Sequence, residues 1–121
     1  MTPNAEEAGI LAKIPVESLE NLKEAAAIIQ GFGCRYVLAK GGHLAGEPID
    51  VLYDGESFLE LPGVRVEGTP VHGTGCAFSA ALAARIALGD SVPDAARLAK
   101  DLVAELIKSA VKLGKGNLLI R

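Results

Sequence analysis

Residues 71–84 (VHGTGCAFSAALAA) decide how the rest of the chain is interpreted. They place a glycine-rich turn directly before an alanine-rich segment that predicts a helix. Because glycine has no Cβ, the backbone at Gly73 and Gly75 can come close to a bound group. The first turn of a helix has unpaired N–H donors and the positive end of the helix dipole, both of which suit phosphate oxygens. We therefore interpret Gly73, Thr74 and Gly75 as an anion hole.

Cys76 lies at the start of the same predicted helix. The helix dipole at this position favours the anionic form of a thiol, which can accept a proton. The sequence thus places a candidate catalytic base beside an anion-binding turn. A plain tight turn followed by a buried, inert cysteine would have the same spacing.

The motif of residues 72–76 (HGTGC), followed by residues 79–81 (SAA), resembles the signature of the hydroxymethylpyrimidine and phosphomethylpyrimidine kinases of thiamine synthesis. These enzymes belong to the ribokinase-like superfamily, most members of which carry Asp at the position of Cys76. The cysteine therefore favours the pyrimidine-kinase branch. The resemblance implies that Cys76 accepts the proton of the substrate hydroxyl while the anion hole holds the transferred phosphoryl group.

A second motif, residues 2–8 (TPNAEEA), matches the Asn-x-x-Glu segment of the same family. The resemblance implies that Asn4 and Glu7 hold Mg²⁺ near the nucleotide phosphates, mostly through water, since this ion gives up its hydration shell reluctantly. The same spacing is that of a helix capping box. The two roles are compatible.

A third match, residues 40–43 (KGGH), follows an apolar stretch, residues 35–40, that predicts a strand. Ligands bind at the carboxyl ends of strands in open α/β sheets. The resemblance implies that Lys40, Gly41 and Gly42 bind ATP. A Gly-Gly turn with a solvated lysine would have the same sequence.

Near the C-terminus, Lys115 lies in residues 114–117 (GKGN), which resemble an ATP-binding segment of the family. The family usually continues with Gly-Pro, whereas this chain has Asn117 and Leu118. Capping of the preceding helix by Gly114, with Lys115 as a favourable terminal cation, explains the segment equally well.

Between these motifs the chain alternates predicted helices and strands. Tyr53 and Phe58 lie in the predicted hairpin and are interpreted as sheet-packing residues. Helical spacing, capping residues and the Asp54-Gly55 turn signal predict a helix over residues 18–32, a hairpin within 49–61, a short strand at 64–66, a helix from Cys76 to about Gly89, and a long helix that follows Ser91 and continues to Gly114.

This order predicts an α/β fold in which a crossover brings strand 35–40 onto a parallel sheet. With the resemblance, we expect a three-layer αβα ribokinase-like architecture with a partial, mostly parallel sheet and an antiparallel hairpin. Residues 1–121 would form the C-terminal portion of a single kinase domain. The family's remaining half, with most pyrimidine contacts and an active-site Asp, has no counterpart here.

Composition restricts the partners. The net charge of −3, without a basic run, argues against nucleic acid. The apolar runs fall short of the roughly 20 residues of a membrane span, and the N-terminus has no signal-peptide pattern, so we expect a cytoplasmic protein. Two cysteines form no disulfide framework or zinc spacing, and neither His43 nor His72 is interpreted as a metal ligand.

The sequence therefore predicts part of an ATP- and Mg²⁺-dependent kinase that phosphorylates hydroxymethylpyrimidine or its monophosphate. Pyridoxal or pyridoxine is the alternative acceptor within the superfamily. A non-catalytic nucleotide- or anion-binding subunit is another alternative. A cysteine-dependent acyl transferase is disfavoured, because no motif supplies its base and orienting residue. We expect the 121 residues alone to be inactive, and either to form a homo-oligomer or to be completed by the missing N-terminal half.

Overall fold

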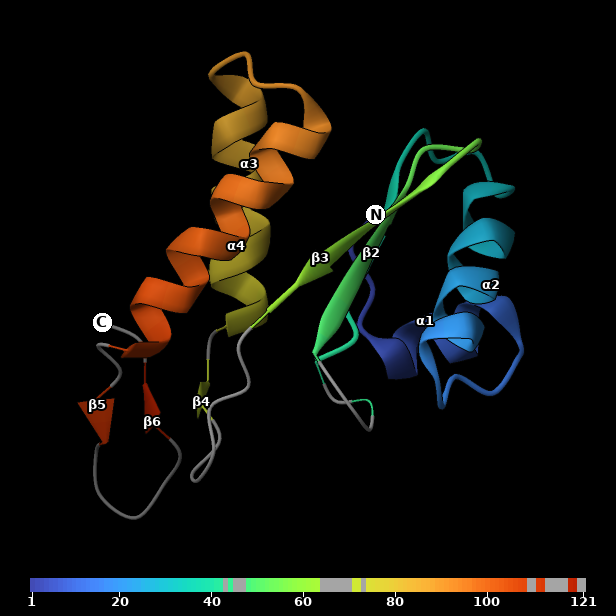
Figure 1. Ribbon diagram of the computed structural model, residues 1–121, viewed down its shortest axis with the longest axis horizontal. Coiled ribbons are helices and arrows are strands. Elements are labelled where there is room, and N and C mark those ends of the chain that lie inside the picture. Colours follow the sequence, from blue (N-terminus) through green and yellow to red (C-terminus); the bar gives the residue numbers. More distant parts are fainter. Residues whose placement is uncertain are drawn as a thin grey trace. The chain divides into compact units, whose positions relative to one another are not determined.

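The structure, a computed structural model, describes residues 1–42, 44, 48–63, 71–72, 74–108, 111–112 and 118–119. The chain forms two compact units, Met1–Arg65 and Val66–Arg121, and each is described by itself (Figure 1). Several predictions concern positions outside the described residues: His43, Gly73, Lys115 and the short strand 64–66.

The first unit opens with an extended segment that runs parallel to strand β1 (Val37–Ala39). Leu38 N donates to Met1 O at 2.9 Å, and Lys40 N donates to Pro3 O at 2.8 Å. The chain travels from this segment to β1 through helices α1 (Ala5–Ala12) and α2 (Leu19–Gln30). Two helices thus lie between this segment and β1, along which it runs in parallel.

The sheet of this unit has the order β1-β2-β3, in which β2 (Ile49–Tyr53) and β3 (Phe58–Pro62) form the predicted hairpin. Gly55 takes a φ of 99° in its turn, a conformation that favours glycine. Both strand pairs are antiparallel. The expectation of a mostly parallel sheet is therefore wrong for these strands. The link from β1 to β2 is too short for the helical crossover that parallel neighbours require.

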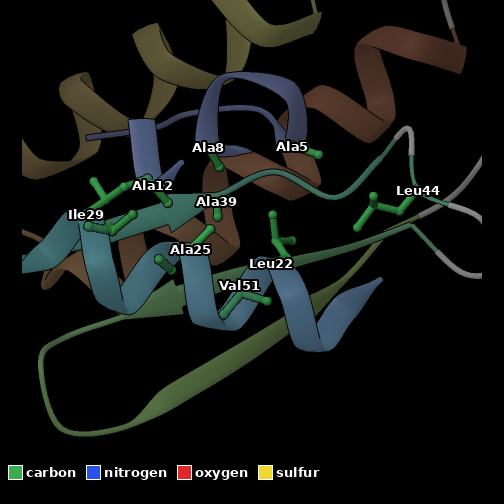
Figure 2. Packing of buried hydrophobic residues seen from close by; sticks show 11 residues of the cluster. Ala5, Ala8, Ala12, Leu22, Ala25, Ile29, Ala39, Leu44 and Val51 are labelled. Atoms are coloured by element: carbon green, nitrogen blue, oxygen red, sulfur yellow. The ribbon is translucent and has the colours of Figure 1, made fainter. Parts of the chain in front are cut away.

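Helix α2 is the predicted helix, with slightly shorter bounds. Ser18 caps it by accepting a hydrogen bond from Asn21 N at 3.2 Å. Its buried face contacts β1, β2 and α1. Figure 2 shows side chains from α1, α2 and the strands pointing toward one another, with alanines dominating α1. Small alanine side chains allow α1 to pack closely on α2. The labelled members of this core are Ala5, Ala8, Ala12, Leu22, Ala25, Ile29, Ala39, Leu44 and Val51.

The second unit is built on helices α3 (Thr74–Ala87) and α4 (Val92–Lys108), which pack against each other (Figure 1). Gly89, with a φ of 100°, lies in the turn between them. Ser91 Oγ accepts a hydrogen bond from Asp94 N at 3.3 Å, as its predicted capping role requires. None of the described helices is both long and apolar enough to cross a membrane.

Helix α4 ends at Lys108, before the predicted end at Gly114. Val111 and Lys112 instead form strand β5 (Val111–Lys112), which pairs antiparallel with β6 (Leu118–Leu119). Strand β4 (Val71–His72) pairs in parallel with β6, in the order β4-β6-β5. Gly114, like Lys115, lies outside the described residues. A β-branched residue such as Val111 loses side-chain freedom in a helix and is well suited to a strand.

Candidate functional site

Two predicted motifs, distant in sequence, meet at one edge of the first unit. The segment that ends at Asn4 lies beside the end of β1, and Asn4 and Lys40 form a parallel bridge. Parallel neighbours end at the same edge of a sheet, so the start of α1 and residues 40–42 share that edge. This is the edge at which ligands bind in open α/β sheets.

Lys40 provides the positive charge at this edge. Its side chain is half-buried, and its backbone N–H is held by Pro3 O. Within the part of the chain that the structure describes, no carboxylate pairs with its ammonium group. A lysine at a strand end, without an acidic partner, is suited to an incoming phosphate.

Asn4 and Glu7 form the capping box of α1. Asn4 Oδ1 accepts from Glu7 N at 2.8 Å, and Glu7 Oε2 accepts from Asn4 N at 2.8 Å. The Glu7 side chain is exposed, and a carboxylate has lone pairs beyond the one used here. Among the described residues, no group of three or more His, Cys, Asp or Glu could hold a metal ion. An exposed carboxylate of this kind fits Mg²⁺, which binds one or two carboxylates and otherwise water and substrate phosphates.

The adjacent glycines Gly41 and Gly42 differ in their surroundings. Gly41 is buried, and its N–H donates to Asp50 Oδ1 at 2.9 Å. A Cβ added to Gly41 would lie 2.2 Å from Ile49 O, whereas one added to Gly42 would meet no atom within 4 Å. The N–H of Gly41 therefore points into the protein, and packing explains the glycine. Gly42 is exposed and leaves room for a ligand.

Asp50 also lies at this edge and is not among the site residues that the sequence predicts. It is 7% exposed and belongs to β2, where its neighbours are mostly apolar. The available signal was one charged side chain in the short apolar run of residues 49–52. The predicted hairpin already accounts for this stretch, so the sequence does not single out Asp50.

The aromatic residues of the hairpin lie elsewhere. Tyr53 stacks on Phe58, with ring centroids 4.3 Å apart, and pairs in register with Val37 at the opposite end of β1 from Lys40. Lys23 lies over the Phe58 ring and binds Glu60 at 2.8 Å, and this hydrogen bond raises the pKa of Lys23. These contacts agree with the interpretation of Tyr53 and Phe58 as packing residues.

The remaining site residues belong to the second unit. Helix α3 begins at Thr74, so the predicted helix does start at the glycine-rich turn. Gly75 is half-buried, and Cys76 is exposed. Cys76 is therefore not buried, contrary to the first part of the alternative interpretation. A thiol in the first turn of a helix, open to solvent, has the surroundings of a reactive cysteine.

Comparison with known proteins identifies the relatives of this chain. The family model described as phosphomethylpyrimidine kinase matches residues 1–121. The hydroxymethylpyrimidine/phosphomethylpyrimidine kinase of Aquifex aeolicus is 44% identical over 117 residues, which make up 96% of this chain and 46% of that protein.

Solved structures show the same relationship. The pyridoxal kinase from Staphylococcus aureus in complex with ADP has a TM-score of 0.93 and 36% identity, covering 99% of this chain and 45% of that one. The phosphomethylpyrimidine kinase from Clostridium difficile 630 has a TM-score of 0.71 and 32% identity, covering 88% of this chain and 42% of that one. The chain thus spans less than half the length of these relatives. The likeness supports the ribokinase-like α/β class, and the chain belongs to the phosphomethylpyrimidine kinase family.

Proposed function

We propose that this chain forms the nucleotide- and phosphoryl-binding part of an ATP-dependent kinase that phosphorylates hydroxymethylpyrimidine or its monophosphate in thiamine synthesis. The observation that carries the proposal is the meeting of Lys40, Gly42 and the Asn4–Glu7 capping box at one sheet edge. Family membership supports the reaction class. The solvent-exposed Cys76 at the start of α3 adds a group that can accept a proton.

The reaction in this proposal is an in-line phosphoryl transfer. Cys76 accepts the proton of the substrate hydroxyl, and the N–H groups of Gly73, Thr74 and Gly75 stabilise charge on the transferred group. Lys40 binds the phosphate oxygens of ATP, next to the exposed backbone of Gly42. Asn4 and Glu7 would hold Mg²⁺ through water, and the ion would supply positive charge that offsets the charge of the phosphates. Lys115 is a further candidate ATP contact, on the resemblance alone.

A pyridoxal or pyridoxine kinase is the second candidate. The likeness to a pyridoxal kinase solved with ADP favours it. Both acceptors present a hydroxymethyl group on an aromatic ring, so the same donor half could serve either. The difference between the two candidates concerns the acceptor contacts, which we expect in the part of the relatives that these 121 residues do not span.

A chimera tests the donor half directly. In it, this chain replaces the matching residues of the Aquifex aeolicus kinase, and ADP release is followed with and without hydroxymethylpyrimidine. We expect ADP release that depends on the pyrimidine. A folded chimera that binds ADP but does not turn over would contradict the catalytic role and favour a non-catalytic nucleotide-binding subunit.

The isolated chain gives a second test. We expect it to bind ADP weakly, to self-associate in light scattering, and to release no ADP in response to the pyrimidine. The reason is that catalysis needs acceptor and phosphoryl donor held in line, and the chain lacks the predicted acceptor contacts. A monodisperse monomer with ordinary kinase turnover would contradict this division of roles.

A further inference from the structure

Asp50 is the one buried polar or charged side chain among the described residues. It lies in β2 beside Val51, which is fully buried. Burial of a carboxylate is costly unless hydrogen bonds compensate for the lost water. An apolar side chain would serve the packing of this strand at lower cost, so the carboxylate requires another reason.

The hydrogen bond of Asp50 explains what the carboxylate does. The last register pair between β1 and β2 joins Ala39 to Val51, so Gly41 lies beyond the ladder. There the Asp50 side chain takes the place of a backbone partner, and Oδ1 accepts the N–H of Gly41 at 2.9 Å in a buried position. Asp50 therefore holds the chain where it leaves the sheet.

Neighbouring hydrogen bonds fix the same segment. The N–H of Lys40 is held by Pro3 O at 2.8 Å, on the side of β1 away from β2. The N–H of Leu44 donates to Gly41 O at 3.1 Å. Successive amides at the strand end are thus anchored to two different segments. The backbone of Lys40 is therefore held at its own N–H and at that of the next residue.

The close packing of Gly41 adds a steric restriction. An added Cβ would lie 2.2 Å from Ile49 O and 3.1 Å from Leu22 Cδ2. There is therefore no room for a side chain between the backbone of Gly41 and β2, and the Asp50 hydrogen bond holds the backbone at this close approach. The position of Lys40, and the direction in which the chain continues to Gly42, follow from these two restrictions.

We propose that Asp50 is a positioning residue for nucleotide binding: it fixes the turn after β1 so that Lys40 and Gly42 meet the phosphates in one geometry. The inference rests on the proposed function of this edge. Asp50 does not itself contact the nucleotide. Its effect comes from ordering the turn before binding, which removes an ordering cost that the nucleotide would otherwise have to offset.

The test measures both the turn and the nucleotide in the 121-residue chain. Asp50→Asn keeps an acceptor oxygen, whereas Asp50→Leu removes it and leaves the buried N–H of Gly41 without a partner. For Asp50→Leu we expect the hydrogen exchange of the Gly41 amide to rise about tenfold and the Mg²⁺–ADP dissociation constant, measured by calorimetry, to rise about tenfold. For Asp50→Asn we expect both changes to stay within about threefold.

Asp54→Leu is the matched control. Asp54 directly follows the same strand at its other end, and its Oδ1 accepts hydrogen bonds from Glu56 N and Ser57 N in the hairpin turn. The control removes the same kind of hydrogen-bonded carboxylate without touching Gly41. We expect its Gly41 exchange and its ADP affinity to equal those of the unaltered chain.

Two results would overturn the inference while leaving the proposed function intact. One is Gly41 exchange unchanged in Asp50→Leu. The other is faster exchange with unaltered ADP affinity, which would make the role of Asp50 purely structural. If the unaltered chain binds no ADP, the proposed function and the inference both fail. If Asp50→Leu does not fold, Asp50→Ser replaces it, because its side chain is too short to make the same bond, and the expected results are the same.

Discussion

The two glycine-rich segments of this chain differ in the local structure that their described residues form. The turn after β1 is anchored by tertiary hydrogen bonds, from Lys40 to Pro3 and from Gly41 to Asp50. In the second segment, residues 74–76 form the start of α3, and Cys76 is exposed there. In the first segment, a side chain from another strand accepts the hydrogen bond of one backbone N–H group. The role proposed for the second segment instead requires backbone N–H groups that can donate to a ligand.

The difference shows that two adjacent glycines of a predicted phosphate-binding motif can be present for different reasons. Gly41 is required by contact with Ile49, and its N–H is already used. Gly42 has open space around it. The motif predicts that both residues bind a ligand, whereas the packing gives them different roles.

The largest expected effect concerns the second turn. In the chimera described above, Cys76→Ala should lower turnover by roughly 10² to 10⁴, the range for loss of a general base. ADP affinity should hardly change, since the thiol acts on the acceptor. Cys34→Ala, at the half-buried cysteine of the first unit, is the control and should retain turnover. Turnover of Cys76→Ala within threefold of the unaltered chimera would contradict the assignment.

A glycine pair tests the first turn. Gly41→Ala should lower the free energy of unfolding by about 2 to 3 kcal/mol, because the new methyl group would overlap the Ile49 carbonyl. Gly42→Ala, at the adjacent exposed position, should stay within about 0.5 kcal/mol. Urea denaturation of the 121-residue chain measures both. Equal stability of the two variants would show that the Gly41 contact relaxes without cost.

The charge of the first turn gives a smaller effect. Lys40→Ala should weaken ADP binding about tenfold, as expected for loss of one charge-assisted contact. Lys40→Arg should restore it only in part, because the planar guanidinium presents its donors differently from an ammonium. Lys108→Ala, an exposed lysine at the end of α4, controls for net charge. Equal affinity in all three variants and the unaltered chain would refute a phosphate role for Lys40.

The smallest effect concerns the hairpin turn at the far end of β2. Hydrogen bonds from the backbone N–H groups of Ser57 and Glu56 hold the pKa of Asp54 below its usual value. Because the folded-state pKa is the lower one, the stabilisation is complete above the unfolded value of about 3.9 and is lost as the pH falls through the folded value. The stability difference between the unaltered chain and Asp54→Asn should therefore shrink below about pH 4. Urea denaturation at several pH values measures it, and a difference that stays constant would contradict the turn's dependence on the carboxylate.

Predictions from the sequence were right where the signal is local. Ser18 marked the start of α2, and Asp54-Gly55 marked the hairpin. Asn4 and Glu7 form the capping box that their spacing allows, and α3 begins at the glycine-rich turn. Capping, turn chemistry and helical periodicity act over a few residues, so they can be read from a short stretch.

The errors concern pairing between distant segments. The apolar stripe after Ser91 continues past Lys108, but the chain leaves the helix so that Val111 can pair with Leu119. The parallel partner of β1 in the first unit is the N-terminal segment, while the strand that follows it pairs antiparallel. The role of each described site residue in catalysis or binding stays a prediction until the variants above are measured.

The sequence by itself determined the family, the residues that carry the proposed chemistry and the starts of the helices, because these depend on residue type and short spacing. Only the tertiary structure decided that Asn4 lies beside Lys40, that Asp50 accepts the Gly41 amide, and that Gly42, unlike Gly41, has space for a side chain. Such contacts join residues that are far apart along the chain. The free energy of such a contact depends on whether packing leaves a backbone N–H or C=O group without another hydrogen-bond partner. A short stretch of sequence does not contain this information.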